Sequence, residues 1–340
     1  MLHAEHGLPE FNTARSLRVT SLWWGLLLLL CCHFAFAYGK YASDFLDLDK
    51  YVAGQTPLPY QARALAGAIM CFADQLPGAG GARELGRKLF KDPRRLQIAG
   101  LAFASLLGSV LTTRASLARL TGSVDFSRWA SLLVVYMAYF NYILYYGPNF
   151  ILPYDLPSLF FFCLGMYLVI SNKSGWYYAC FVVAVLNRET VFLLTIFFLI
   201  WHWHRLEPRP ASSRLRWLAP HWLAHHYANN PKEGNGLFLP HFEDNFRVIL
   251  KPYHWPNLLS NYGFTLPLLV GLRSWIKNRA ISQAALLPLW FVVMMVLGVI
   301  IETRIFGELI SYMALAVGLI LYNRWYAPGQ AALEGHSLQS

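Results

Sequence analysis

Residues 21–37 read SLWWGLLLLLCCHFAFA, an apolar run without a single Asp, Glu, Lys or Arg. An α-helix of roughly 20 residues spans the hydrocarbon core of a bilayer, so the run predicts a membrane-spanning helix. Arg15 and Arg18 precede it, and it ends in Ala35-Phe36-Ala37, a pattern that a cleavable signal peptide would share. Because many apolar segments follow, we interpret the run as an uncleaved signal anchor.

The whole chain shares this apolar character. Of its 340 residues, 56% are hydrophobic and 14% are charged, which excludes an ordinary soluble domain and indicates a polytopic membrane protein. The apolar blocks lack the alternating pattern of outer-membrane strands, so we expect an all-α transmembrane helix bundle. The sequence contains no P-loop, dinucleotide fingerprint, nucleophile elbow or nucleic-acid-binding motif. The net charge of +10 indicates a cytoplasmic excess of Lys and Arg and an attraction to anionic lipids or phosphates.

Nine segments are candidate membrane spans. They are residues 20–38, 97–113, 129–146, 156–171, 175–186, 190–204, 258–272, 284–300 and 305–323. The fifth and sixth are short, and only Asn187-Arg188-Glu189-Thr190 separates them, which predicts a helical hairpin over 175–204 with NRET at its tip. The distribution of Lys and Arg places both termini in the cytoplasm, which requires an even number of crossings. A tenth, re-entrant or buried segment is therefore expected within 205–257, where the sequence defines no clear helix.

We expect one transmembrane domain over residues 1–325, followed by a flexible cytoplasmic tail at 326–340. A long extracytoplasmic first loop, residues 39–95, separates the first two spans. Within it, QARALAGAIMCFADQL (61–76) has the apolar spacing of an amphipathic helix that lies on the membrane surface. GARELGRKLFKDPRR (81–95) carries six basic side chains, which suit a lipid phosphate, a pyrophosphate or bulk anionic lipid.

Charged residues gather in the connections expected on the extracytoplasmic side. These are the first loop (Asp44, Asp47, Asp49), the turn PYDLP (Asp155), the tip NRET (Arg188, Glu189) and ETR (Glu302, Arg304) within the stretch VIIETRIFGELI at 299–310. Charges at the edge of a bilayer are costly and usually face a bundle interior or a water-filled cavity. Four such connections on one side predict a single polar site capped by the first loop. Alternatively, Arg188–Glu189 and Glu302–Arg304 are ion pairs that only lock helix ends together.

The first loop begins with a group of acids, SDFLDLD at 43–49. Neighbouring carboxylates raise one another's pKa, so Asp44 or Asp47 could act as a general base. The same oxygens could instead hold a hard divalent cation such as Mg²⁺ or Mn²⁺. A solvated acidic turn that performs no chemistry is the third interpretation, and the residues alone leave the need for a metal undecided.

The layout of the chain resembles the GT-C superfamily of integral-membrane glycosyltransferases, which use polyprenyl-phosphate-linked sugars. The similarity lies in the cytoplasmic N-terminus, the single helix before a long acidic first loop, and the paired short helices around VVAVLNRETVFLL (182–194). The stretches PYDLPSLFFF (153–162), LNRET (186–190) and ETRIFGEL (302–309) are similar to those of small bacterial members. The acids of the first loop depart from the compact acidic pair of the family.

This resemblance implies transfer of a sugar from a polyprenyl-phosphate-linked donor to a glycolipid, polysaccharide or protein outside the bacterial cytoplasmic membrane. Asp44, or otherwise Asp47, would be the general base, and Asp155 would stabilise an oxocarbenium-like transition state. The residues expected to bind the donor and its phosphate are Arg63, Arg188, Glu189, Glu302 and Arg304. The expected partners are the lipid-linked donor and membrane lipids, with no nucleic acid.

Without the resemblance, the residues indicate only a multi-helix membrane protein with an outward-facing ionic site. A transporter or flippase of lipid-linked or anionic solutes would use the same charges along a pathway, with discontinuous helices at mid-bilayer. A polysaccharide polymerase or ligase would differ chiefly in its acceptor. A non-catalytic assembly subunit is the remaining alternative.

Overall fold

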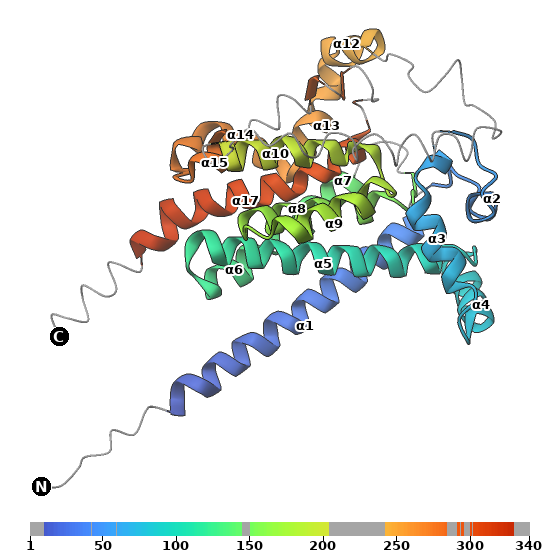
Figure 1. Ribbon diagram of the computed structural model, residues 1–340, viewed down its shortest axis with the longest axis horizontal. Helices are drawn as coiled ribbons and strands as arrows, with labels where there is room; N and C mark the ends of the chain where they lie inside the picture. The colour runs from blue at the N-terminus through green and yellow to red at the C-terminus, as the bar shows by residue number, and fades with distance from the viewer. Residues whose placement is uncertain are drawn as a thin grey trace, which may run out of the picture.

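The computed structural model describes residues 10–41, 43–58, 60–144, 150–203, 242–283 and 302–329, with short pieces at 291–292, 294–295 and 300. Over these residues every regular element is a helix, which confirms the all-α prediction (Figure 1). Predictions for 204–241, 284–290 and 330–340 lie outside the described residues. Residues 326–329 were expected to begin a flexible tail, and instead they continue the C-terminal helix to Gly329.

The N-terminal half contains two long helices joined by the first loop. The long helices are α1 (Glu10–Tyr41) and α5 (Arg95–Thr121). The loop between them folds into α2 (Leu48–Val52), η1 (Tyr60–Ala62), α3 (Ala64–Ala73) and α4 (Ala79–Phe90). The amphipathic helix predicted over 61–76 therefore corresponds to η1 and α3, and α4 is an additional helix. In Figure 1 the helices α3 and α4 lie beside the end of α5 where that helix begins.

The remaining elements follow α5 in shorter pieces. They are α6 (Val124–Ala130), α7 (Leu133–Tyr142), α8 (Asp155–Ile170), α9 (Ser174–Val185), η2 (Glu189–Val191) and α10 (Phe192–His202). After the gap come α12 (Phe242–Leu250), η4 (Pro252–His254), α13 (Trp255–Ser260), η5 (Asn261–Phe264), α14 (Thr265–Leu272), η6 (Arg273–Trp275) and α15 (Arg279–Gln283). The chain ends with η7 (Thr303–Leu309), α17 (Ile310–Leu321) and the π-helix η8 (Tyr322–Tyr326).

Within the part of the chain that the structure describes, three helical segments are long and apolar enough to cross a membrane: Arg18–Tyr41, Arg95–Thr121 and Arg304–Gly329. Their exposure to the surroundings differs strongly. The apolar window of the third is 89% buried inside the protein, whereas that of the first is only 28% buried. The C-terminal helix is therefore the centre of the bundle, and the N-terminal helix lies at its edge. In Figure 1, α1 crosses the other helices obliquely from the outside.

The bundle core forms where α17 packs against α5, α7, α8 and α14. Helices α5 and α8 make the most extensive pairing. This pairing depends on close approach at Gly108, where an added Cβ would lie 2.6 Å from the ring of Phe160. Small residues such as glycine let two helices approach closely, so their side chains pack tightly at the contact.

The predicted hairpin over 175–204 is confirmed. Helices α9 and α10 flank the NRET tip, and the ring of Tyr177 near the start of α9 stacks on Phe198 near the end of α10, with centroids 4.9 Å apart. The two helices therefore run antiparallel. Their contacts with α8 bring the tip to the N-terminal end of that helix, where Asp155 lies.

Two predicted spans are not continuous helices. Segment 129–146 is divided between α6 and α7. Segment 258–272 is broken at η5, because Tyr262, Gly263 and Phe264 all have left-handed backbone conformations, with φ of 58°, 64° and 59°. The hydroxyl of Tyr136 donates to the Gly263 carbonyl at 3.0 Å, and Asn141 Oδ1 accepts from the Tyr262 N–H at 2.9 Å. These contacts from α7 satisfy backbone groups that the break releases, which hydropathy alone does not reveal.

Candidate functional site

The tip of the α9–α10 hairpin places an arginine inside the bundle. Asn187 Nδ2 donates to the Tyr154 carbonyl at 2.9 Å and to Ser158 Oγ at 2.8 Å, which fixes the tip against the start of α8. Arg188 follows in an extended conformation, and its side chain is 93% buried. A buried guanidinium is costly unless it is paired, so its partners determine whether the arrangement is stable.

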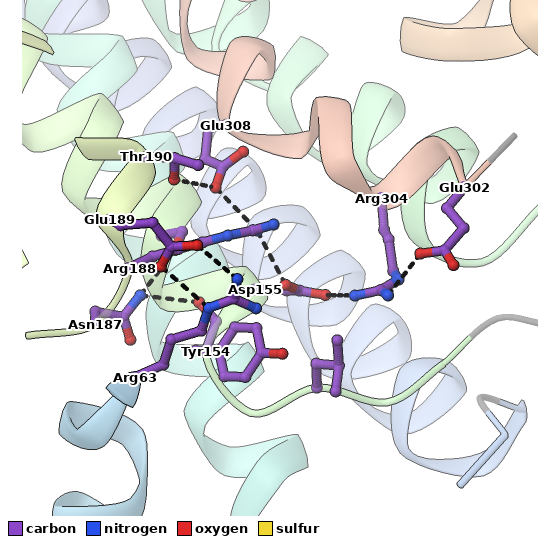
Figure 2. Close-up of polar contacts among 12 residues, drawn as sticks. Arg63, Tyr154, Asp155, Asn187, Arg188, Glu189, Thr190, Glu302, Arg304 and Glu308 are labelled. Carbon is purple, nitrogen blue, oxygen red and sulfur yellow. Dashed lines mark hydrogen bonds and ion pairs between the residues drawn. The ribbon is translucent and has the colours of Figure 1, made fainter. Parts of the chain in front are cut away.

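Arg188 has two carboxylate partners from distant parts of the chain (Figure 2). Its Nη1 atom lies 3.2 Å from Asp155 Oδ1 and 2.9 Å from Glu308 Oε1. Both carboxylates are fully or almost fully buried. The hydroxyl of Thr190 also donates to Glu308 Oε1 at 3.0 Å. One hairpin tip therefore joins the first turn of α8 to the stretch that precedes α17.

A second arginine extends the ion-pair network on the other side of Asp155. Arg304 Nη1 lies 3.5 Å from Asp155 Oδ2, and Arg304 Nη2 lies 2.6 Å from Glu302 Oε2. The Arg304 guanidinium also lies 5.7 Å from the ring centroid of Phe150. Glu302 is 23% exposed and Arg304 is 14% exposed, so this end is more open than the Arg188 end.

A third arginine, Arg63 from the first loop, forms a forked pair with the hairpin. Its Nη2 atom lies 2.6 Å from Glu189 Oε1, and its Nε donates to Glu189 Oε2 at 3.2 Å. The guanidinium also lies over the ring of Tyr154 at 4.6 Å. The Leu65 N–H donates to the Leu186 carbonyl at 3.0 Å, so backbone and side chain both attach the first loop to the hairpin.

The inner part of this ionic cluster keeps unused hydrogen-bonding capacity. Within the described part of the chain, the Nε atoms of Arg188 and Arg304 and the Oε2 atom of Glu308 are buried and have no hydrogen-bond partner. In proteins, the great majority of buried polar atoms have a hydrogen-bond partner. Several buried atoms without one in the same place therefore require an explanation. Water or a bound polar ligand would supply one.

Six of the predicted site residues are brought together in this cluster. They are Arg63, Asp155, Arg188, Glu189, Glu302 and Arg304. The interpretation of Arg188–Glu189 and Glu302–Arg304 as two local pairs holds only for the second. Arg188 pairs instead with Asp155 and Glu308, and Glu189 with Arg63.

The first-loop acids have partners of their own. Asp44 Oδ1 lies 2.7 Å from Arg95 Nη2 at the start of α5, and its side chain is 63% exposed. Asp47 caps α2 by accepting a hydrogen bond from the Lys50 N–H at 3.0 Å. That hydrogen bond, together with the nearby Lys50 ammonium, lowers the pKa of Asp47. Neither acid takes part in the described ion pairs of the buried cluster.

Contacts of its two chain neighbours nevertheless connect Asp44 to residues 150–151, beside the cluster. The Ser43 carbonyl accepts from the Ile151 N–H at 3.0 Å, and the rings of Phe45 and Phe150 lie 4.8 Å apart. Phe150 is the residue whose ring faces Arg304. Asp44 is thus held on the Arg304 side of the cluster, although its carboxylate does not enter the ion pairs there.

Sequence reasoning did not assign Glu308, Asn187 and Thr190 to the site. Glu308 had a usable signal, because it follows Arg304 by four residues and continues the same interrupted apolar stretch. Thr190 and Asn187 lie beside Arg188 in the predicted hairpin tip, so their proximity was also foreseeable. Their particular partners were not, because those lie on other helices.

The described residues do not assemble a metal centre. Among them, no three His, Cys, Asp or Glu side chains come together as potential ligands. The oxygens of Asp155 and Glu302 already face guanidinium groups, which is the arrangement of an ion-pair network. A divalent cation at the first loop stays a prediction.

An apolar cavity of about 590 Å³ adjoins the same structural region. Its walls come from α13, η5, α14 and η7, and include Tyr262, Leu269, Phe306 and Leu309. Phe306 and Leu309 flank Glu308 in η7, and the Tyr262 hydroxyl donates to the Phe306 carbonyl at 3.1 Å. Arg273 and Ser282 also contribute to the lining, which is otherwise mainly apolar.

Comparisons with protein-family models, with curated proteins and with solved structures found no match to the chain. Its function is therefore inferred from the residues and their geometry.

Proposed function

We propose that the protein is a membrane glycosyltransferase of the GT-C type, which moves a sugar from a polyprenyl-phosphate-linked donor to an acceptor outside the cytoplasm. The observation that carries this proposal is the buried cluster of Asp155, Arg188, Arg304 and Glu308 beside an apolar cavity. A lipid-linked sugar phosphate has a matching division between an anionic head and an apolar tail.

The phosphate of the donor binds at the open end of the cluster. Arg304 has a buried Nε without a hydrogen-bond partner among the described residues, and it is more exposed than Arg188. Guanidinium groups bind phosphate oxygens through paired hydrogen bonds, and they remain charged at any physiological pH. The prenyl chain occupies the cavity lined by Leu269 and Phe306. Because this lining is apolar, moving the chain there from the bilayer costs little free energy.

The chemistry assigned to the site is displacement at the anomeric carbon. An acceptor hydroxyl attacks this carbon while its proton passes to Asp44, and the bond to the phosphate oxygen breaks with its electron pair. Arg304 and Arg188 stabilise the charge that develops on the departing phosphate. Asp44 suits the base better than Asp47, because the cap of α2 lowers the pKa of Asp47 and because Ser43, the neighbour of Asp44, is hydrogen-bonded to Ile151.

In this proposal the short apolar helices complete the membrane domain. Three segments are long enough to span alone, and α8, α9 and α10 would add crossings because their charged ends meet at one level around Asp155 and Arg188. The segments predicted at 129–146, 258–272 and 284–300 would bring the number of crossings to nine, and a further segment within 205–257 would make ten. The charged ends face outside, and the membrane is the bacterial cytoplasmic one.

A transfer assay tests the proposal. Full-length protein in vesicles is incubated with polyprenyl phosphate that carries radiolabelled glucose, mannose or a pentose, together with an envelope lipid extract as acceptor source. We expect label to move into a product that lacks the polyprenyl phosphate. Asp44→Asn lowers the rate about 10²–10⁴-fold if it removes a general base. Arg247→Gln, which alters an exposed pair on α12, is the matched control and leaves the rate unchanged.

Failure of the enzyme hypothesis is recognisable in the same vesicles. If unlabelled polyprenyl phosphate binds the wild type and not Arg304→Gln, while no donor releases its sugar, a lipid-binding protein without transferase activity remains. The apolar cavity also suits a flippase, because it reaches from η7 to Arg273. Movement of fluorescent polyprenyl phosphate between leaflets, abolished by Arg304→Gln, would then identify transport as the activity.

A further inference from the structure

The six basic residues at 81–95 divide into a group paired within the loop and an exposed group. Arg94 is 10% exposed and pairs with Asp49 at 2.8 Å and with Asp74. Arg95 is equally buried and pairs with Asp44. Arg83 is 42% exposed, and it pairs with Asp74 at 2.8 Å. These three arginines hold the loop together, so their charges are compensated within the protein.

Arg87, Lys88 and Lys91 form the exposed group. Glu84 is the acid in contact with Arg87 and Lys88, at 3.4 and 3.9 Å, and more than half of its side chain is exposed. Exposed pairs of this kind are weak, so the positive charge remains available to an external partner.

Apolar side chains are exposed on the same helix. Leu85 and Leu89 lie one turn apart on one face of α4 and are 47% and 38% exposed. Another side of the helix is attached to the protein through Phe90, whose side chain is buried. A helix that exposes leucines beside lysines and arginines has the composition of an interfacial helix.

The position of α4 places these side chains at the ends of two membrane-spanning helices. Lys40, in the last turn of α1, donates to the Leu89 carbonyl at 2.9 Å, and the ring of Phe90 lies 5.6 Å from that of Phe36. Four residues separate Phe90 from the start of α5 at Arg95. The C-terminal end of α4 is therefore held at the level where α1 leaves the membrane and α5 enters it.

We propose that the second half of α4 and its C-cap Lys91, residues 84–91, dock on a membrane surface rich in anionic phospholipids. Leu85 and Leu89 enter the region between head groups and acyl chains, and Arg87, Lys88 and Lys91 contact lipid phosphates. Charge complementarity favours anionic phospholipids as the partner, because each exposed Lys or Arg near an anionic membrane surface strengthens the attraction of the protein to that surface. The proposal does not depend on the glycosyltransferase function, because no catalytic residue contributes to the surface.

Hydrogen exchange of the full-length protein in lipid vesicles tests the docking. One set of vesicles contains phosphatidylcholine alone, and the other contains phosphatidylcholine with phosphatidylglycerol. We expect amide exchange across residues 82–91 to be about tenfold slower with phosphatidylglycerol, an effect that salt reverses. The variant R87Q/K88Q/K91Q should lose this difference.

A matched variant separates local binding from a general effect of charge. K173Q/R247Q/K251Q removes three exposed basic residues outside the first loop and should keep the slower exchange with phosphatidylglycerol. Equal exchange of residues 82–91 in both kinds of vesicle would overturn the proposal. Retention of the full difference by the R87Q/K88Q/K91Q variant would overturn it as well.

Discussion

Asp155 and Glu308 share one nitrogen atom, Nη1 of Arg188, at 3.2 and 2.9 Å. Asp155 begins α8 and Glu308 lies in η7, so this single guanidinium connects two helical segments that are far apart in the sequence. Both carboxylates lie out of contact with water. Their negative charges are tolerated only because Arg188 and, for Asp155, Arg304 compensate them.

Arg188→Gln is expected to destabilise the protein strongly. It leaves two buried carboxylates sharing less positive charge, and breaking a buried ion pair by removing one partner costs about 3–5 kcal/mol. Denaturant unfolding in detergent measures the change. Arg247→Gln, which removes an exposed pair, should change the free energy of unfolding by about 1 kcal/mol or less. Similar unfolding of the two variants would contradict the ionic cluster as described.

Arg63→Gln is expected to loosen the first loop without unfolding the bundle. The forked pair with Glu189 is partly exposed, and pairs of this kind contribute about 1 kcal/mol or less. The main-chain bond between Leu65 and Leu186 remains. Hydrogen exchange should therefore accelerate in α3 and stay unchanged in α17. Uniform acceleration across both helices would show that Arg63 supports the whole bundle instead.

Gly263→Ala tests the break in the predicted span at 258–272. The left-handed backbone of Gly263 costs a non-glycine residue about 1–2 kcal/mol. The added Cβ would also lie 2.2 Å from a ring carbon of Tyr136, and overpacking adds about 1–3 kcal/mol. Gly271→Ala is the control, because nothing lies within 4 Å of its added Cβ. The thermal unfolding temperature should fall for Gly263→Ala and not for Gly271→Ala. If it stayed unchanged for both variants, the segment would be a continuous helix and the break at η5 would be wrong.

The first loop should open at acidic pH. Partial burial raises the pKa of Asp74, but hydrogen bonds from Arg94, Arg83 and Gln97 outweigh it, so the pKa is lowered overall. A lowered pKa in the folded state stabilises the loop above the unfolded pKa of about 4, and this contribution is lost as the pH falls through the folded value. Hydrogen exchange in α3 and α4 should therefore accelerate below about pH 4. In Asp74→Asn this pH dependence should largely disappear.

Much of the candidate site could be predicted from the sequence, because charged residues that interrupt apolar runs are conspicuous. Arg188, Glu302 and Arg304 were found in this way, and so was the hairpin that carries the NRET tip. The roles of the first-loop acids were less predictable. Asp44 pairs with an arginine at the start of α5, and this pairing depends on how the loop folds back.

The sequence by itself determined the helical class, because apolar composition and helix length are local properties. It also determined which charges must find partners, since an unpaired charge in an apolar environment is too costly. Only the tertiary structure decided the pairings. Arg188 reached Glu308 instead of its neighbour Glu189, and Arg94 turned inward while Lys91 stayed exposed. Such choices depend on which helix ends meet in space, and the local sequence does not encode that.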